Sequence, residues 1–359
     1  MSSADAQVEI TRPTELLDDR GRLVTPGFAR FPYWRYDRRR IAAPWWRIKE
    51  WDYYAVIDET DGAGFAVTFS DLGYIGLVAV CVFDLEAGRL REWAALRPFS
   101  RGRLGLHPDC DEPHELRFDD PKRSVSVEIS RSETRRRLRF AVTGDGNGGA
   151  PGSGAPGQEA AAEVTLFQPP DQERMVIATH WPGELQAFYY NQKINCMPAE
   201  GHLDIGAERR EFHQAHTFAT LDWGRGRWTY RNHWYWASAS GTCEGTAVGI
   251  NLGYGFSDRS PATENMLFYD YRAHKLGDVG MERDPERILE PWRITDADGR
   301  LELRFRPRLN RHADFNLVLA RSRQDQVFGY FDGRAVLDDG TPLYLQALPG
   351  FVEDVYNRW

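Results

Sequence analysis

The chain has 359 residues, a net charge of −8 at pH 7, and ordinary shares of hydrophobic (42%) and charged (27%) residues, as expected of a globular protein with a large core. The negative charge argues against a nucleic-acid partner, because phosphate binding requires a basic surface. The longest apolar run, at 75–83, is too short to span a bilayer, so we expect no integral membrane association.

The four cysteines lie far apart in the sequence, at Cys81, Cys110, Cys196 and Cys243. That spacing fits neither a disulfide scaffold nor a zinc site, and it predicts free thiols in a reducing compartment. Residues 1–17 are polar and acidic and lack the apolar segment of a signal peptide. We therefore expect a cytoplasmic location, and no motif predicts a cofactor.

Short apolar runs and period-two alternation dominate the chain, whereas helical periodicity is rare. A short helix is predicted only near Asp284–Leu289. So many strands without crossover helices favour antiparallel barrels or sandwiches. The predicted strands are 47–58, 65–70, 75–83, 90–99, 124–130, 137–142, 163–168, 174–180, 185–195, 211–221, 233–240, 245–252, 264–271, 300–306, 314–320, 326–331 and, after a tight turn at Asp339-Gly340, 343–347.

The segment 144–162 is rich in Gly, Pro, Ala and Ser and has no apolar anchor. It lies between two predicted strands, so we interpret it as a flexible hairpin insertion within a domain. The length of the chain favours two β domains, at 1–200 and 201–359.

The most distinctive segment is 222–241, which begins with Asp222-Trp223-Gly224-Arg225-Gly226. Glycines on both sides of Arg225 allow a tight backbone path, and Asp222 can pair with Arg225. In the strand that follows, alternate side chains form two faces, with Trp234, Trp236, Ser238 and Ser240 on one and His233 and Tyr235 on the other. The first face suits an amphipathic ligand, although a structural turn and a Trp-rich core would use the same residues.

Two other predicted strands place polar side chains on one face. Glu50 and Asp52 share a face with Tyr54, and Lys193 shares one with two asparagines, Asn191 and Asn195. Such groups are either solvent-exposed or form a polar patch inside a cavity. Charged side chains are usually exposed, so we expect exposure for both sets. The short arginine runs at 38–40 and 135–137 are likewise interpreted as solvated faces.

Metal binding and nucleophilic hydrolysis have little support in the sequence. His213 and His216 are three apart in a predicted strand and so point to opposite faces, while His202 and Asp204 share a face but are only two ligands. No GxSxG motif is present. We therefore predict no metal site.

Seven motifs along the chain are distinctive, namely Lys49–Tyr54, Ser70–Gly76, Leu221–Gly226, Trp236–Gly241, Asn251–Gly253, Thr263–Asn265 and Gly350–Val355. They resemble those of an uncharacterised bacterial family, domain of unknown function 2804, and the resemblance extends from about Leu16 to Trp359. The family is distantly similar to the lipocalin-like group of carotenoid hydratases, pericyclases and cyclases. The resemblance implies an all-β fold of two lipocalin-like antiparallel barrel or sandwich halves with an apolar pocket.

Hydratases of that group carry an Asp beside His and Trp, and the Asp is thought to protonate an alkene. Asp222-Trp223-Gly224 is the nearest counterpart, with Trp223 in the position of the His. We therefore predict acid-catalysed hydration, isomerisation or cyclisation of an isoprenoid or lipid-like molecule, since burial can keep a carboxylic acid neutral. The candidate catalytic residues are Asp222 and Glu264. The candidate substrate-binding residues are Trp51, Tyr74, Asn191, Lys193, Trp223, Arg225, His233, Trp234, Trp236 and Asn251.

Two other functions fit the same residues. A non-catalytic carrier of lipids or other hydrophobic ligands needs the apolar pocket but no proton donor. A carbohydrate-active protein would use tryptophan platforms and two carboxylates about 5–10 Å apart. For the enzyme and for the carrier, the expected partner is a small hydrophobic ligand. The oligomeric state is not predicted.

Overall fold

The computed structural model describes residues 6–120, 125–144, 159–316 and 321–358. These residues form strands and two short 3-10 helices, with no α-helix among them. The elements up to residue 227 are β1 (Thr14–Glu15), β2 (Gly27–Ala29), β3 (Trp34–Arg35), η1 (Arg38–Arg40), η2 (Trp45–Arg47), β4 (Ile48–Asp58), β5 (Ala63–Asp71), β6 (Ile75–Asp84), β7 (Arg89–Pro98), β8 (His114–Asp120), β9 (Val125–Arg131), β10 (Arg135–Val142), β11 (Ala160–Phe167), β12 (Met175–Trp181), β13 (Glu184–Ile205), β14 (Glu208–Phe212) and β15 (Thr217–Arg227). The remaining strands are β16 (Arg231–Cys243), β17 (Thr246–Tyr254), β18 (Met266–Tyr269), β19 (Arg272–Lys275), β20 (Val279–Glu282), β21 (Trp292–Asp296), β22 (Leu301–Asn316), β23 (Arg321–Val336) and β24 (Pro342–Arg358).

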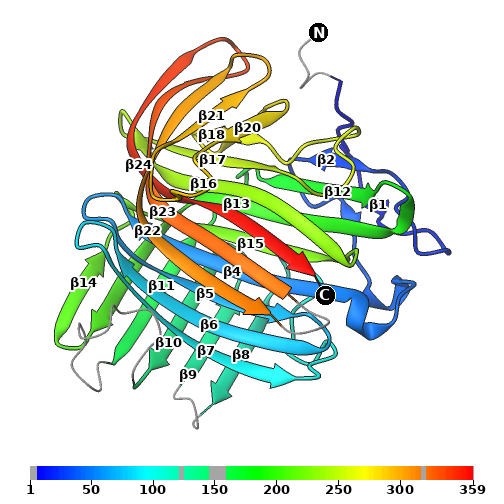
Figure 1. Ribbon diagram of the computed structural model, residues 1–359, viewed down its shortest axis with the longest axis horizontal. Coiled ribbons are helices and arrows are strands. Elements are labelled where there is room, and N and C mark those ends of the chain that lie inside the picture. The colour runs from blue at the N-terminus through cyan, green and yellow to red at the C-terminus, as the bar shows by residue number, and fades with distance from the viewer. Residues whose placement is uncertain (1–5, 121–124, 145–158, 317–320, 359) are drawn as a thin grey trace. The chain divides into compact units, whose positions relative to one another are not determined.

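The strands form two large sheets (Figure 1). The thirteen-stranded sheet has the order β7-β6-β5-β4-β15-β13-β11-β10-β9-β8, with β2, β12 and β14 joined beside this path. The nine-stranded sheet has the order β19-β18-β17-β16-β24-β23-β22-β21-β20. One of the two sheets is nearly closed into a barrel and the other is a half-barrel. This architecture confirms the predicted all-β fold with two lipocalin-like antiparallel halves.

The chain divides into two compact units that are interleaved in sequence. Unit 1 comprises Met1–Ala43, Glu173–Cys196 and Arg225–Trp359, and unit 2 comprises Pro44–Gln172 and Met197–Gly224. The strands β13 and β15 therefore contribute residues to both units. The boundary expected between residues 200 and 201 falls inside β13, where both residues pair with β11.

Each unit has its own hydrophobic core. In unit 1, one face of the nine-stranded sheet buries a cluster that includes Trp292, Phe305 and Phe331, and the two phenylalanine rings lie 4.6 Å apart. In unit 2, Phe65 packs against Phe140 at 5.2 Å. Side chains alternate between the two faces of a strand, which directs these residues inward. In β9 every second residue is buried, which is the predicted pattern of a half-buried strand.

Most predicted strands are present, and several are longer than their apolar runs. The run at 185–195 lies in the 22-residue β13 (Glu184–Ile205), and the run at 343–347 is the start of β24. The predicted turn at Asp339-Gly340 is confirmed, because Gly340 has φ +89° and its N–H donates to the Leu337 carbonyl at 3.0 Å. The strands β1–β3, β8 and β19–β21 were not predicted, and β14 overlaps only the start of the predicted strand 211–221.

Two element predictions are wrong. Residues 284–289 form bends and a turn, in which the Arg287 N–H bonds to the Asp284 carbonyl at 3.3 Å. So short a segment gains too few hydrogen bonds to offset the cost of helix nucleation. The predicted strand at 211–221 is interrupted at 213–216, where the N–H groups of His216 and Thr217 both bond to the His213 carbonyl.

Of the predicted insertion at 144–162, residues 145–158 lie outside the described residues. Ala160–Ala162 belong to β11, which pairs with β10 on one side and β13 on the other. The prediction of a hairpin connection therefore agrees with the pairing of β10 and β11.

Among the described residues, no helix has the length and hydropathy that a membrane crossing requires.

Candidate functional site

The candidate site lies in unit 1, on the face of the nine-stranded sheet that carries alternate residues of β16. The register pairs Trp236 with Gly253 and Ser238 with Asn251 on β17. The Trp236 indole N–H donates to Asn251 Oδ1 at 2.7 Å, and Asn251 Nδ2 donates to the Glu264 carbonyl at 2.7 Å. This chain of bonds fixes the backbone that carries Glu264.

A buried ion pair occupies this face. Lys193 on β13 places its Nζ 3.4 Å from the centre of the Trp236 ring and 3.8 Å from Glu264 Oε2. The Tyr189 hydroxyl donates to the same oxygen at 3.1 Å. Both charged side chains are only 4% exposed, so the carboxylate has a cation and a hydroxyl donor in a dry environment.

Gly253 makes room for the carboxylate. A Cβ at this position would lie 1.7 Å from Glu264 Oε1, which is far inside contact distance. The Gly253 N–H donates to Asn265 Oδ1 at 2.7 Å, so the neighbouring backbone is also tied to the segment before β18. The glycine in the motif Asn251-Leu252-Gly253 is therefore required by close approach to an acid.

A small pocket opens beside Glu264. Its free volume of about 10 Å³ is space for about one water molecule. The Phe256 ring packs edge-to-face on Tyr189 at 4.8 Å and stacks on Trp228 at 5.7 Å. The residues lining the pocket are Ile177, Tyr189, Gly253, Tyr254, Phe256, Ser257, Arg259, Ala262 and Glu264.

The two serines of the β16 face are bonded within the protein. Asn195 Nδ2 lies 2.9 Å from Ser238 Oγ and 3.1 Å from the Ile250 carbonyl. The Cys196 N–H donates to Ser240 Oγ at 3.0 Å. These bonds join β13 to β16 and β17. The two serines therefore have a structural role in holding the strands together.

Four sequence candidates therefore meet in unit 1, namely Lys193, Trp236, Asn251 and Glu264. Tyr189 was missed, although it lies two residues before Asn191 and shares a strand face with Lys193. The polar face was recognised at Asn191, Lys193 and Asn195, and the position two residues before Asn191 on the same face is Tyr189.

The structure also places the other candidates. In unit 1, His233 is on the opposite face of β16, and its Nε2 lies 2.8 Å from Asp354 Oδ1. Trp234 shares the face of Trp236, where its ring lies 5.5 Å from that of Trp228 and its indole N–H donates to Glu353 at 3.1 Å. Asn191 and Arg225 are fully buried in the same unit. The candidates Trp51, Tyr74, Asp222 and Trp223 belong to unit 2.

Residues 217–227 form the continuous strand β15, so the glycines on both sides of Arg225 do not mark a turn. Gly224 instead provides space for an indole, since a Cβ there would lie 2.1 Å from the Trp51 ring.

The expected exposure of the polar strand faces is also wrong. Glu50 and Asp52 are 3% and 2% exposed, and Lys193 is 3% exposed between two buried asparagines. Both sets are therefore buried, and buried polar groups are retained in proteins by hydrogen bonds and ion pairs.

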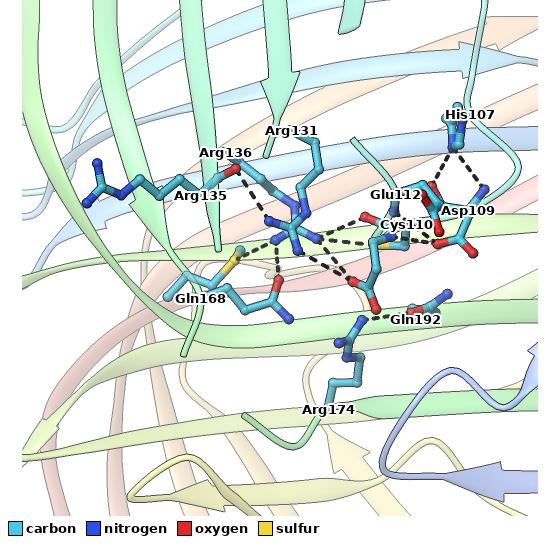
Figure 2. A network of polar contacts seen from close by, with 12 residues as sticks. His107, Asp109, Cys110, Glu112, Arg131, Arg135, Arg136, Gln168, Arg174 and Gln192 are labelled. Atoms are coloured by element: carbon cyan, nitrogen blue, oxygen red, sulfur yellow. Dashed lines mark hydrogen bonds and ion pairs between the residues drawn. The ribbon is translucent and has the colours of Figure 1, made fainter. Parts of the chain in front are cut away.

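Unit 2 contains a second polar cluster, around Arg136 (Figure 2). Arg136 is 1% exposed, so the expectation of a solvated arginine run holds only for its exposed neighbours Arg135 and Arg137. Its guanidinium donates to the Gln168 side chain and, at 3.2 Å, to the Cys110 carbonyl. Asp111 Oδ1 lies 3.9 Å from the Nη2 atom of Arg136. These contacts fasten the segment before β8 to β10, which is a structural role.

No group of three or more His, Cys, Asp or Glu residues suited to a metal occurs in the part of the chain that the structure describes. His213 and His216 lie in a turn and not in the predicted strand, and His216 Nδ1 is 2.7 Å from Asp58 Oδ2. The four cysteines are free, as predicted, and burial raises the pKa of Cys196 to about 12.

The profile of the family described as a domain of unknown function, DUF2804, matches residues 7–359. The chain belongs to this family. The match confirms the resemblance seen in the seven motifs. No curated protein matches the DUF2804 chain.

Solved structures similar to the DUF2804 protein include a protein assigned as AttH from Nitrosomonas europaea, with 15% identity, a TM-score of 0.48, and coverage of 87% of this chain and 92% of that one. Kievitone hydratase from Nectria haematococca has 12% identity, a TM-score of 0.49 and coverage of 86% and 88%. CghA with Sch210972 has 9% identity, a TM-score of 0.41 and coverage of 87% and 88%.

Proposed function

We propose that the DUF2804 protein is an enzyme that acts on a hydrophobic, isoprenoid-like or lipid-like small molecule by proton transfer, in a hydration, isomerisation or cyclisation. The observation that supports this is the Glu264 carboxylate, which lines an aromatic pocket and lies within reach of Tyr189 and Lys193. We place the proton transfer on Glu264, because a hydroxyl donor and a cation lie beside its carboxylate.

The surroundings of Glu264 define its role. The Lys193 cation and the Tyr189 hydroxyl both stabilise the ionised carboxylate. An ionised carboxylate is a base, so Glu264 takes a proton from a carbon next to a double bond or from an attacking water. Tyr189 or Lys193 then donates a proton to the substrate, or stabilises the negative charge that develops on it.

Substrate binding requires the pocket to open. Pockets for drug-sized ligands have volumes of about 300 Å³ or more, far above the present free volume. The segment that forms one wall contains Gly255 at φ +106° and Ser257 at φ +53°, and it belongs to neither β17 nor β18. We expect this wall, 255–262, to move outward when substrate binds.

The proposal is tested by incubating the protein with a panel of lipophilic alkenes and enones in D2O. Proton removal and return introduce deuterium, which mass spectrometry detects. Glu264→Gln keeps the size of the side chain but removes the base, so the rate should fall by about 100-fold or more. Glu302→Gln is the matched control, since Glu302 is an exposed carboxylate of the same unit that pairs with Arg293 at 3.1 Å.

An unchanged rate in Glu264→Gln would remove Glu264 from the mechanism. Recovery of one equivalent of unmodified lipid from the purified protein, with no deuterium incorporation in any assay, would identify a carrier instead.

A further inference from the structure

Unit 2 displays two aromatic side chains that no part of the proposed function uses. Trp46 on η2 is 50% exposed, and Phe99, directly after β7, is 56% exposed. The Trp45 ring lies between them, at 5.4 Å from Trp46 and 6.4 Å from Phe99. We call Trp46, Phe99, Arg101 and Arg103 the Trp46–Phe99 platform.

The backbone presents Phe99 and Arg101 in an unusual conformation. Their φ angles are +54° and +53°, in the left-handed region that bulky residues rarely adopt. The Phe99 N–H donates to the Tyr74 carbonyl at 2.7 Å, and the Arg101 N–H donates to the Gly73 carbonyl at 2.9 Å. The turn is therefore held in a strained form that keeps an apolar ring in water, which is typical of functional surfaces.

The motif Ser70–Gly76 anchors this turn. Asp71 Oδ1 accepts from Ser100 Oγ at 2.7 Å and from the Gly73 N–H at 2.9 Å. Gly73 has φ +84°, and a Cβ there would lie 2.3 Å from the Trp45 carbonyl. The motif thus joins η2 to the turn after β7, which fixes Trp46 and Phe99 on one rigid base.

The platform is positively charged although the protein is acidic. Arg101 lies over the Trp45 ring at 4.5 Å, and Arg103 donates to the Phe99 carbonyl at 2.7 Å. Within the described residues, neither arginine forms an ion pair with a carboxylate. Two guanidinium groups without a paired carboxylate thus place positive charge beside the exposed aromatic rings, which suits an anionic partner.

We propose that the Trp46–Phe99 platform docks on the surface of an anionic phospholipid bilayer. Trp and Phe side chains insert at the boundary of head groups and acyl chains, and arginines beside them attract anionic head groups. The turn is already ordered, so little conformational entropy is lost on docking. This inference is independent of the proposed function, because it concerns residues outside the Glu264 pocket.

The test is co-sedimentation of the full chain with vesicles of phosphatidylcholine, with or without 30% phosphatidylglycerol. We expect binding only to the anionic vesicles, and weaker binding as salt is added. Arg101→Glu/Arg103→Glu and Trp46→Ser/Phe99→Ser should each lower the partition coefficient by roughly tenfold or more. Trp46→Phe, which keeps an aromatic ring, should bind like the unchanged protein.

Matched controls are Arg334→Glu and Tyr344→Ser, which change an exposed arginine and an exposed aromatic residue of unit 1. Both should leave vesicle binding unchanged. The inference fails if the protein does not bind anionic vesicles, or if both double variants bind like the controls. It also fails if light scattering shows a dimer that the double variants dissociate, because a second copy would then cover the platform.

Discussion

At the scale of single residues, the chemistry of the candidate site depends on one carboxylate and the space left for it. Glu264 is buried, and its oxygens meet Tyr189, Lys193 and the bare Cα of Gly253. A side chain at 253 must displace the carboxylate from these partners. The glycine is thus as specific a requirement as the acid.

Gly253→Ala should destabilise the fold by about 1–3 kcal/mol, because the added methyl overpacks against the buried Glu264 side chain. The free energy of unfolding, measured with urea, checks this prediction. Gly280→Ala is the control, since no atom lies within 4 Å of a Cβ built there. Equal stability of the two variants would contradict the close approach at Gly253.

Lys49 provides a pH-dependent prediction. Its Nζ donates to the carbonyls of Trp46 and Leu72, each at 2.8 Å. Burial, followed by repulsion from Arg47, lowers its pKa to about 7. The unfolded value is about 10.4, so between these pH values the unfolded state binds more protons than the folded state. The stability contributed by Lys49 therefore rises with pH above about 7.

We expect the unfolding free energy of the unchanged protein, relative to Lys49→Met, to increase between pH 7 and 9. The slope should be at most about 1.4 kcal/mol per pH unit. Urea unfolding at pH 6, 8 and 9 measures it. A difference that is independent of pH, or that decreases, would show that the ammonium keeps its ordinary pKa.

At the scale of elements, alternation is the pattern that sequence reasoning reads best. It divides β16 into two faces, and the register with β17 and the contacts of Trp236 and His233 agree with that division. When a strand face carries polar side chains, alternation in the sequence does not predict whether that face is buried or exposed. Lys193 and Glu50 were therefore expected in solvent, whereas their burial depends on partners that are distant in sequence.

Element boundaries were less predictable for a related reason. β13 continues to Ile205 through Glu200, Gly201 and His202, a segment with no apolar run. Pairing with β11 and β14 on its two sides keeps this polar stretch extended. Hydrogen bonds between distant strands thus override local composition.

At the scale of the whole molecule, the interleaving of the two units leads to a prediction. Unit 1 takes three separate segments and unit 2 takes two, and a cut between residues 200 and 201 divides β13. Each fragment would then lack strands that its sheet requires. We expect neither 1–200 nor 201–359, expressed alone, to unfold cooperatively in thermal circular dichroism. A cooperative transition in either fragment would show that it folds independently.

The sequence by itself determined the all-β class, the family and the two faces of the strand after residue 231, because alternation and short motifs are local properties. Only the tertiary structure decided that Glu264, Lys193 and Tyr189 meet, since Lys193 and Tyr189 lie on β13 whereas Glu264 precedes β18, about 70 residues further along the chain. It likewise decided that Arg225 lies in a strand and that Gly253 accommodates an acid. These features arise from cross-strand register and close approach, which no local pattern encodes.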